Sequence, residues 1–176
     1  MTRYQTRPLT SDDFSALVEL EQDIFGGSGE ELLCSYYIRL CCDFFADTCF
    51  ITLVDGRPVG YLLGFVNRRE AYCTTLAVRP EFQRTRVVTL LLRQFVRVIM
   101  SRVDSCWFTV KPDNVAARKL HKMLGATDVE VRKDFYGPGD ERIVSRIDRA
   151  AFQVLRQKYE RLGLVEPQPA AAEEAA

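Results

Sequence analysis

The residues best suited to bind an anion lie between Val78 and Val88, where an apolar run gives way to a polar loop and then to a long helix. Arg79-Pro80 ends the apolar run, and apolar residues recur from Val87 onward at the spacing of one helical face. The first turn of a helix carries backbone N–H groups that have no acceptor within the helix, and its dipole favours negative charge. The sequence therefore predicts a site for a phosphate-like group at the start of this helix.

The same stretch resembles the acyl-CoA-binding motif of the GNAT superfamily of N-acetyltransferases, which reads V-x-P-x-[YF]-[RQ]-x-x-G-x-[GA] before a leucine-rich helix. The positions that fit are Val78, Pro80, Phe82, Gln83, Leu91 and Leu92. Arg86 and Val88 depart from the motif, because the family has small residues at both positions. Glycine lets backbone N–H groups approach a pyrophosphate without a Cβ in the way. Two interpretations remain open: the guanidinium of Arg86 binds the phosphates instead, or Arg86 is solvated beside a loop too crowded for the donor.

The resemblance implies acetyl-CoA as co-substrate, held by this loop and by the strand before it. The expected donor-binding residues are Leu76, Ala77, Val78, Gln83, Arg84, Thr85, Arg86, Val87, Val88 and Asn114. A backbone N–H near Leu76 to Val78, where the strand separates from its neighbour, is expected to stabilise the oxyanion without help from a side chain.

A second motif, Val110 to Ala126, is similar to the family's V-x-x-x-N-x-x-A-x-x-L-Y-x-x-x-G-[FA]. Asn114 matches the asparagine that bonds the pantetheine arm, and it also stands where a helix favours an N-cap. His121 falls where the family commonly has a tyrosine that protonates the departing thiolate. It is the only histidine in the chain, and an ordinary imidazole pKa suits proton donation near neutral pH. The alternative interpretation is a surface histidine beside Lys122.

The segment Lys133 to Gly137, with Asp140 to Val144, resembles the closing hairpin of the branch that acetylates protein N-termini. Tyr136 in this hairpin is a second candidate acid or an acceptor contact. The general base is not evident, because that branch usually has a glutamate where this chain has Thr109. Glu70 lies on an expected loop, and a base is dispensable if the amine arrives neutral.

The acceptor is expected to be a primary amine, either a protein or peptide N-terminus or a small amine. Tyr36, Tyr37 and Arg39 are candidates for substrate contact, and packing of these aromatic rings on the sheet is the alternative. The stretch Tyr37 to Gly60 resembles in part the diaminobutyrate acetyltransferases, which keeps a small diamine open. A different class also remains open: a non-catalytic GNAT-like binding or regulatory module with impaired CoA binding.

Alternating strand and helix patterns must position these residues. The expected strands are Tyr4–Leu9, Cys49–Val54, Pro58–Val66, Tyr72–Val78, Asp104–Val110, Thr127–Phe135 and Arg142–Ile147, and the expected helices are Ser11–Ile24, Glu30–Phe45, Val87–Ile99, Asn114–Leu124 and Arg146–Leu162. This order predicts an α/β GNAT fold whose central, mostly antiparallel sheet of about six to seven strands is flanked by helices. One domain is expected over residues 1–162, with a disordered tail over residues 163–176.

Composition excludes several classes of function. The chain has 24 basic and 24 acidic residues, so its net charge is zero and no overall field steers it to nucleic acid or to a membrane surface. No apolar run approaches the roughly eighteen residues that span a bilayer, so a cytoplasmic location is expected. The six cysteines lack CxxC spacing and are expected to be buried and free of metal. The C-terminal helix, basic on its outer face, is expected to dock on the domain or to form a homodimer contact.

Overall fold

A single seven-stranded sheet organises the computed structural model, which describes residues 2–28 and 31–167. Its strands are β1 (Tyr4–Pro8), β2 (Phe50–Val54), β3 (Arg57–Asn67), β4 (Glu70–Val78), β5 (Ser105–Val110), β6 (Thr127–Arg132) and β7 (Arg142–Asp148). Their order across the sheet is β1-β2-β3-β4-β5-β7-β6. Within the described chain, β4 and β5 pair parallel and all other neighbours pair antiparallel. The expected mixed, mostly antiparallel sheet is confirmed.

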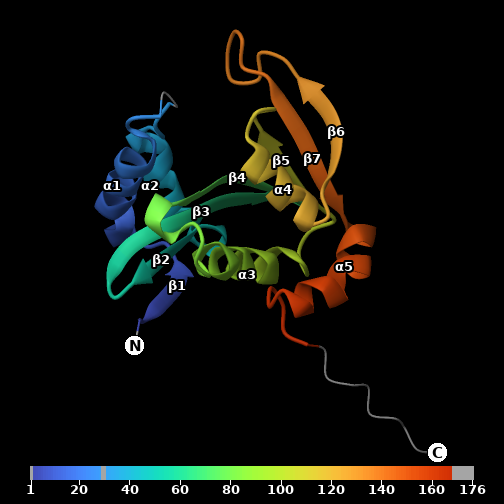
Figure 1. The fold of residues 1–176 in the computed structure, drawn as a ribbon, viewed down its shortest axis with the longest axis horizontal. Coiled ribbons are helices and arrows are strands. Elements are labelled where there is room, and N and C mark those ends of the chain that lie inside the picture. Colours follow the sequence, from blue (N-terminus) through green and yellow to red (C-terminus); the bar gives the residue numbers. More distant parts are fainter. Residues whose placement is uncertain (1, 29–30, 168–176) are drawn as a thin grey trace, which may run out of the picture.

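Helices cover both faces of this sheet (Figure 1). They are α1 (Phe14–Phe25), α2 (Ser35–Asp43), α3 (Val87–Ile99), α4 (Val115–Met123) and α5 (Arg149–Arg161), with short 3-10 turns at Ser11–Asp13, Ala46–Thr48 and Pro80–Phe82. The apolar sides of α1 and α2 pack on one face around Leu17, Leu20 and Ile38. Those of α3, α4 and α5 pack on the other face. Side chains of a strand alternate between the two cores, so neighbouring residues in β4 and β5 face different sets of helices.

The pairing between β4 and β5 is short, and this opens the sheet. β4 pairs with β5 only from Glu70 to Cys73, opposite Ser105 to Phe108. A register shift between β3 and β4 leaves Thr74 as an extra residue, which is a β-bulge that bends the strand. Beyond this bulge, residues 75–78 pair with β3 but have no strand partner on the β5 side within the described chain. The predicted separation of the two strands is therefore confirmed.

Several element boundaries differ from the sequence-based expectation, and three of them have an identifiable local or long-range contact as their cause. The second helix begins at Ser35 rather than near residue 30, because Leu33 N donates to the Glu21 carboxylate at 3.0 Å and Cys34 is extended. The last helix begins at Arg149, since β7 continues to Asp148, whose carboxylate caps the helix by accepting from Ala151 N at 2.8 Å. β6 ends at Arg132 rather than Phe135, because Asp134 adopts a positive φ of 53° in the hairpin loop.

The ordered domain also extends past Leu162, where its end was expected. Gly163 leaves α5 with a φ of +66°, and Leu164 N donates back to Tyr159 O at 2.8 Å, closing the helix end. The Leu164 side chain is only 1% exposed, and Arg93 donates to the carbonyl of Gly163. Residues 163–164 therefore pack on the domain. Val165 packs against the same core and Glu166 pairs with Arg97, whereas residues 168–176 of the expected tail lie outside the described residues.

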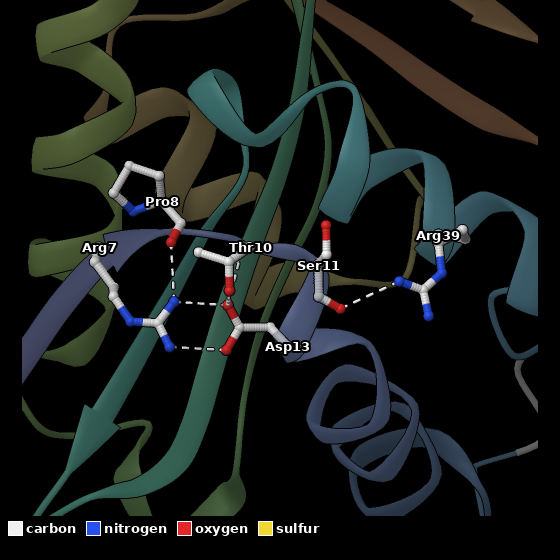
Figure 2. A network of polar contacts seen from close by, with 6 residues as sticks. All are labelled: Arg7, Pro8, Thr10, Ser11, Asp13 and Arg39. Atoms are coloured by element: carbon white, nitrogen blue, oxygen red, sulfur yellow. Dashed lines mark hydrogen bonds and ion pairs between the residues drawn. The ribbon is translucent and has the colours of Figure 1, made fainter.

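A polar network fixes the start of α1 (Figure 2). The guanidinium of Arg7 donates to both carboxylate oxygens of Asp13, at 2.6 and 2.8 Å, and Thr10 donates to the same carboxylate through its backbone N–H and its hydroxyl. Burial alone would raise the pKa of Asp13, but these hydrogen bonds lower it below its ordinary value. Arg39 of α2 donates to the carbonyl of Ser11 at 3.1 Å, so the network also ties α2 to the start of α1.

The cysteines follow the expectation of burial with one exception. Cys41, Cys42, Cys49, Cys73 and Cys106 are buried and unpaired, whereas Cys34 is exposed just before α2. No group of three or more metal-binding side chains occurs in the part of the chain that the structure describes. None of the described helices is long and apolar enough to cross a membrane.

Candidate active site

Three hydroxyl groups meet where β4 and β5 separate. The Tyr72 hydroxyl, from β4, lies 2.6 Å from Oγ1 of Thr109 in β5 and 3.0 Å from the hydroxyl of Tyr136 in the β6–β7 hairpin. Burial raises the pKa of Tyr72 far above its ordinary value, so this phenol stays protonated at neutral pH. The three groups can therefore accept and donate hydrogen bonds to a polar substrate, but none of them is an anionic base.

The helix α2 borders the same side of the sheet. Tyr37 lies within hydrogen-bonding distance of Thr74, with 2.8 Å between their oxygens, and Thr74 in turn donates to the carbonyl of Leu63 at 3.2 Å. Of the three expected acceptor contacts, Tyr37 is the one that reaches the site. Tyr36 is 81% exposed, and Arg39 bonds Ser11 and so holds the start of α1.

His121 approaches β5 from the opposite face. Its ring centroid lies 4.7 Å from that of Phe108, the neighbour of Thr109 whose side chain points to the α3 side of the sheet. Its Nδ1 is buried without a hydrogen-bond partner among the described residues. Burial lowers the pKa of His121 to about 4, partly opposed by Asp128. His121 is therefore half-buried against Phe108, and the lowered pKa leaves its imidazole neutral near pH 7.

The expected donor loop presents backbone donors. The first hydrogen bond within α3 runs from Leu90 N to Arg86 O at 2.9 Å, so the amides of Val88 and Thr89 precede the helical ladder. Thr85 donates its hydroxyl to the carbonyl of Phe82 at 2.7 Å, which closes the turn before the helix. The loop is thus held in place by its own contacts. Val87 N donates to the Thr85 hydroxyl at 3.4 Å, whereas the amides of Val88 and Thr89 have no acceptor within the described part of the chain.

Side chains around this loop are anchored in different ways. Gln83 donates to the carbonyl of Val78 at 3.3 Å and ties the loop to β4, and Arg84 is exposed. The guanidinium of Arg86 lies 4.1 Å from the ring centroid of Tyr4 in β1. Val88 packs against the core. The side chains at the two positions that depart from the motif are therefore engaged by the protein itself, and the amides of Val88 and Thr89 still precede the helical ladder.

Asn114 caps α4, as the sequence predicted. Its Oδ1 accepts from Ala117 N at 3.0 Å. The side chain is exposed, and its amide NH₂ offers two further donors that capping does not use. Capping and a contact with a donor molecule are therefore compatible.

The sequence suggested that Glu70 lies on a loop. In the structure it is the first residue of β4. Its carboxylate accepts from Trp107 Nε1 at 3.3 Å and from the Ser105 hydroxyl at 3.4 Å. Glu70 thus lies two residues before Tyr72 in the same strand. Sequence reasoning missed Tyr72 itself. The available signal was the alternation of hydroxyl residues at positions 72 and 74, which places both side chains on one face of a strand.

A model described as the acetyltransferase (GNAT) family matches residues 14–126, which is more than half of the chain. The chain belongs to the GNAT acetyltransferase family. Enzymes of this family transfer an acyl group from a coenzyme A thioester to an amine, with acetyl-CoA as co-substrate, so the protein is an acyl-CoA-dependent N-acetyltransferase. The residues that line the separated strands and the start of α3 fit such a donor, because they offer backbone donors, hydroxyls and an exposed amide.

Individual GNAT proteins show the same relationship. An uncharacterised N-acetyltransferase of Methanocaldococcus jannaschii is 26% identical over 144 residues, covering 78% of this chain and 87% of the relative. The ribosomal protein bS18 alanine N-acetyltransferase of Salmonella typhimurium is 30% identical over 83 residues, about half of each protein, at 47% and 56%. The structure of Arabidopsis thaliana Naa50 in complex with the bisubstrate analogue CoA-Ac-MVNAL has a TM-score of 0.70 at 14% identity, covering 82% and 98%. This last likeness concerns the fold.

Proposed function

We propose that this GNAT enzyme acetylates the α-amino group of a protein or peptide. The observation that carries the proposal is the hydroxyl chain of Tyr136, Tyr72 and Thr109, because it brings the β6–β7 hairpin to the point where β4 and β5 separate. Relatives named for N-terminal acetylation support the same acceptor, since one acts on the alanine of bS18 and Naa50 was solved with a peptide analogue.

The acceptor amine is proposed to bind on the α2 side of the sheet. The hydroxyls of Tyr72 and Tyr136 accept hydrogen bonds from the amine and orient its lone pair toward the separated strands. Because Tyr72 remains protonated, the amine arrives neutral or releases its proton through the hydroxyls to water. Tyr37, held by Thr74, forms the wall opposite the hairpin.

The acyl group is proposed to lie along the unpaired edge of β4. Acetyl-CoA supplies the thioester carbonyl, and a backbone N–H near Leu76, Ala77 or Val78 donates to the negative charge that develops on its oxygen. The first turn of α3, from Val87 and Val88, and the loop residues Gln83 to Arg86 are proposed to bind the pyrophosphate. The amide of Asn114 is proposed to bond the pantetheine arm.

His121 is proposed to give a proton to the departing thiolate. It approaches β5 from the α3 side, whereas Thr109 faces the acceptor side. This arrangement suits an acyl transfer, because the attacking amine would lie on one side of the thioester and the departing thiolate on the other. A thiolate beside the ring favours the protonated imidazole, which raises the low pKa that burial imposes on the free enzyme.

A panel of acceptors tests the proposed function. The enzyme is incubated with acetyl-CoA and with short peptides that begin with alanine, serine or methionine, and the products are located by tandem mass spectrometry. Peptides with a blocked N-terminus and an internal lysine, and 2,4-diaminobutyrate, are run beside them. Acetylation confined to free N-termini supports the proposal, whereas turnover of 2,4-diaminobutyrate alone would replace it with a small-diamine function.

Calorimetry with acetyl-CoA and with CoA is the matched control. Binding without turnover of any acceptor separates a missing acceptor from a lost donor site. Absence of binding would favour the non-catalytic module.

We also propose a cytoplasmic location, in keeping with relatives named for a ribosomal substrate. Self-association is proposed through the outer face of α5, where Val154 is 81% exposed. Light scattering after size exclusion, with Val154→Glu as the comparison, tests the homodimer.

A further inference from the structure

A buried carboxylate lies in the middle of α1 and has no role in the chemistry described above. Glu21 is 3% exposed. One of its oxygens accepts the hydroxyl proton of Tyr61, and the other accepts from Leu33 N at 3.0 Å. Within the described chain no lysine or arginine is paired with it, and burial raises its pKa. A carboxylate is costly to bury, and an apolar residue would fill the same space at lower cost.

The two hydrogen-bond donors belong to different parts of the fold. Tyr61 is fully buried in β3, and its register partner is Ala77 in β4. Ala77 lies in the part of β4 that has no β5 partner and that is proposed to hold the acyl group. Leu33 lies just before α2, whose Tyr37 reaches Thr74. Glu21 therefore connects β3, which pairs with β4 at the proposed acyl site, to Leu33. Leu33 in turn leads into α2, whose Tyr37 forms the proposed wall of the acceptor site, called the acceptor wall below.

The carboxylate itself does not meet the acceptor. Both oxygens are engaged, and the exposed fraction of 3% leaves no surface for an amine. Its effect must pass through Leu33 and the start of α2. Cys34, which is extended with a φ of −69° and a ψ of 151°, stands between Leu33 and the first residue of the helix.

We infer that Glu21 is a positioning residue for the acceptor, which fixes the chain entering α2 against β3 and so sets where Tyr37 stands. This inference rests on the proposed function for its kinetic consequence. Its structural part, the attachment of residues 31–37 to the sheet, stands apart from any acceptor.

Kinetics of Glu21→Gln, Glu21→Leu and Tyr61→Phe test the inference. Loss of a hydrogen bond to a charged group is expected to raise the acceptor KM roughly tenfold in Glu21→Leu. Glu21→Gln keeps an oxygen for Leu33 N and an amide for Tyr61, so it should recover much of the lost affinity. Tyr61→Phe should fall between the two. The dissociation constant of acetyl-CoA should stay within twofold throughout, because the donor site lies on other elements.

Asp13→Asn is the matched control. It alters another buried carboxylate at the start of the same helix, bonded to Arg7 and Thr10 (Figure 2). It should lower the thermal midpoint and leave the acceptor KM unchanged. If Asp13→Asn raises the acceptor KM as much as Glu21→Leu does, the effect is general loss of stability and the inference is wrong.

Hydrogen–deuterium exchange provides a readout that needs no substrate. Faster exchange of the amides of residues 33–37 in Glu21→Leu and Tyr61→Phe, with unchanged exchange in α3, supports the inference even where the acceptor assay finds no product. Unchanged exchange in residues 33–37 overturns it. Failure of the acceptor panel alone counts against the proposed function and leaves the attachment of residues 31–37 to be decided by exchange.

Discussion

The Tyr72 hydroxyl lies 2.6 Å from Oγ1 of Thr109, and this contact runs diagonally from a paired residue of β4 to the first residue of β5 beyond the last backbone pair. The side-chain bond thus holds the two strands together at the end of their backbone ladder. It also brings two polar groups, with Tyr136 as a third, to the side that the acceptor is proposed to use.

Tyr72→Phe removes the central hydroxyl of this chain. We expect turnover to fall roughly ten- to a hundredfold, because orientation of the amine and transfer of its proton both depend on it. Acetyl-CoA affinity should hardly change. Thr52→Val is the control, since it removes a hydroxyl from a similar pair, 2.8 Å from Thr6, between β1 and β2. Turnover of Tyr72→Phe equal to that of Thr52→Val would contradict the proposed acceptor site.

His121→Phe keeps the ring and removes the proton donor. Under the proposed role, turnover should decrease roughly ten- to a thousandfold, in the range of general-acid effects, with little change in acetyl-CoA affinity. His121→Tyr should restore much of the rate, because the family commonly has tyrosine at this position. Unchanged turnover in His121→Phe would pass the role to Tyr136 or to water.

The low pKa of His121 predicts a pH dependence of stability. Its folded pKa of about 4 lies below the ordinary value of 6.5, so the unfolded chain binds a proton in this interval that the folded protein does not. Stability is therefore complete above the unfolded pKa and is lost as the pH falls toward the folded one. Between about pH 7 and about pH 5 the loss from this group should be about 2 kcal/mol. Urea unfolding of the parent and of His121→Phe at both pH values isolates the contribution of this group to the free energy of unfolding. An equal loss of stability between the two pH values in both proteins would show that the imidazole is not desolvated.

Arg86 distinguishes the two interpretations of the donor loop. If its guanidinium leaves the ring of Tyr4 and binds the donor phosphates, Arg86→Ala should weaken acetyl-CoA binding roughly ten- to a hundredfold. Tyr4→Leu should then bind at least as tightly as the parent, because it releases the guanidinium. Calorimetry measures both. Affinity that increases in Arg86→Gly would show instead that the side chain obstructs the loop.

Two truncations locate the C-terminal boundary. A chain ending at Leu162 loses the buried Leu164, which should lower the thermal midpoint by roughly 4 to 10 °C. A chain ending at Pro167 should have the same thermal midpoint as the parent, because the deleted residues are polar or small and have little apolar surface to bury. Equal thermal midpoints for the two truncated chains would mean that burial of Leu164 does not contribute to the stability of the fold.

Local chemistry explains which parts of the fold could be predicted. Asp55-Gly56 supports a hairpin with φ values of 50° and 82°, and Gly125 ends α4 with a φ of +85°, as their residue types require. Asn114 caps its helix through a contact three residues away. Each of these depends on neighbours in sequence. The start of α2 depends instead on a distant partner: the contact between Glu21 and Leu33 keeps residue 33 out of α2, although the local pattern favours a longer helix.

The same distinction applies to the candidate site. The loop before α3 was located from its motif, but Tyr72 was missed because its importance comes from the register of β4 with β5. The environment of His121 likewise depends on Phe108 and on how α4 packs against β5. The motif located His121 and Asn114 in one helix, but it carried no information about burial, and burial lowers the pKa of His121.

Five of the six cysteines are inaccessible, and this has a practical use. Cys34 is the exposed thiol of the set, and it follows Leu33 directly at the beginning of α2. A maleimide fluorophore should therefore attach at one defined position in the folded native protein, without removal of the other thiols. Its emission anisotropy would report the movement of the acceptor wall in real time as peptides bind.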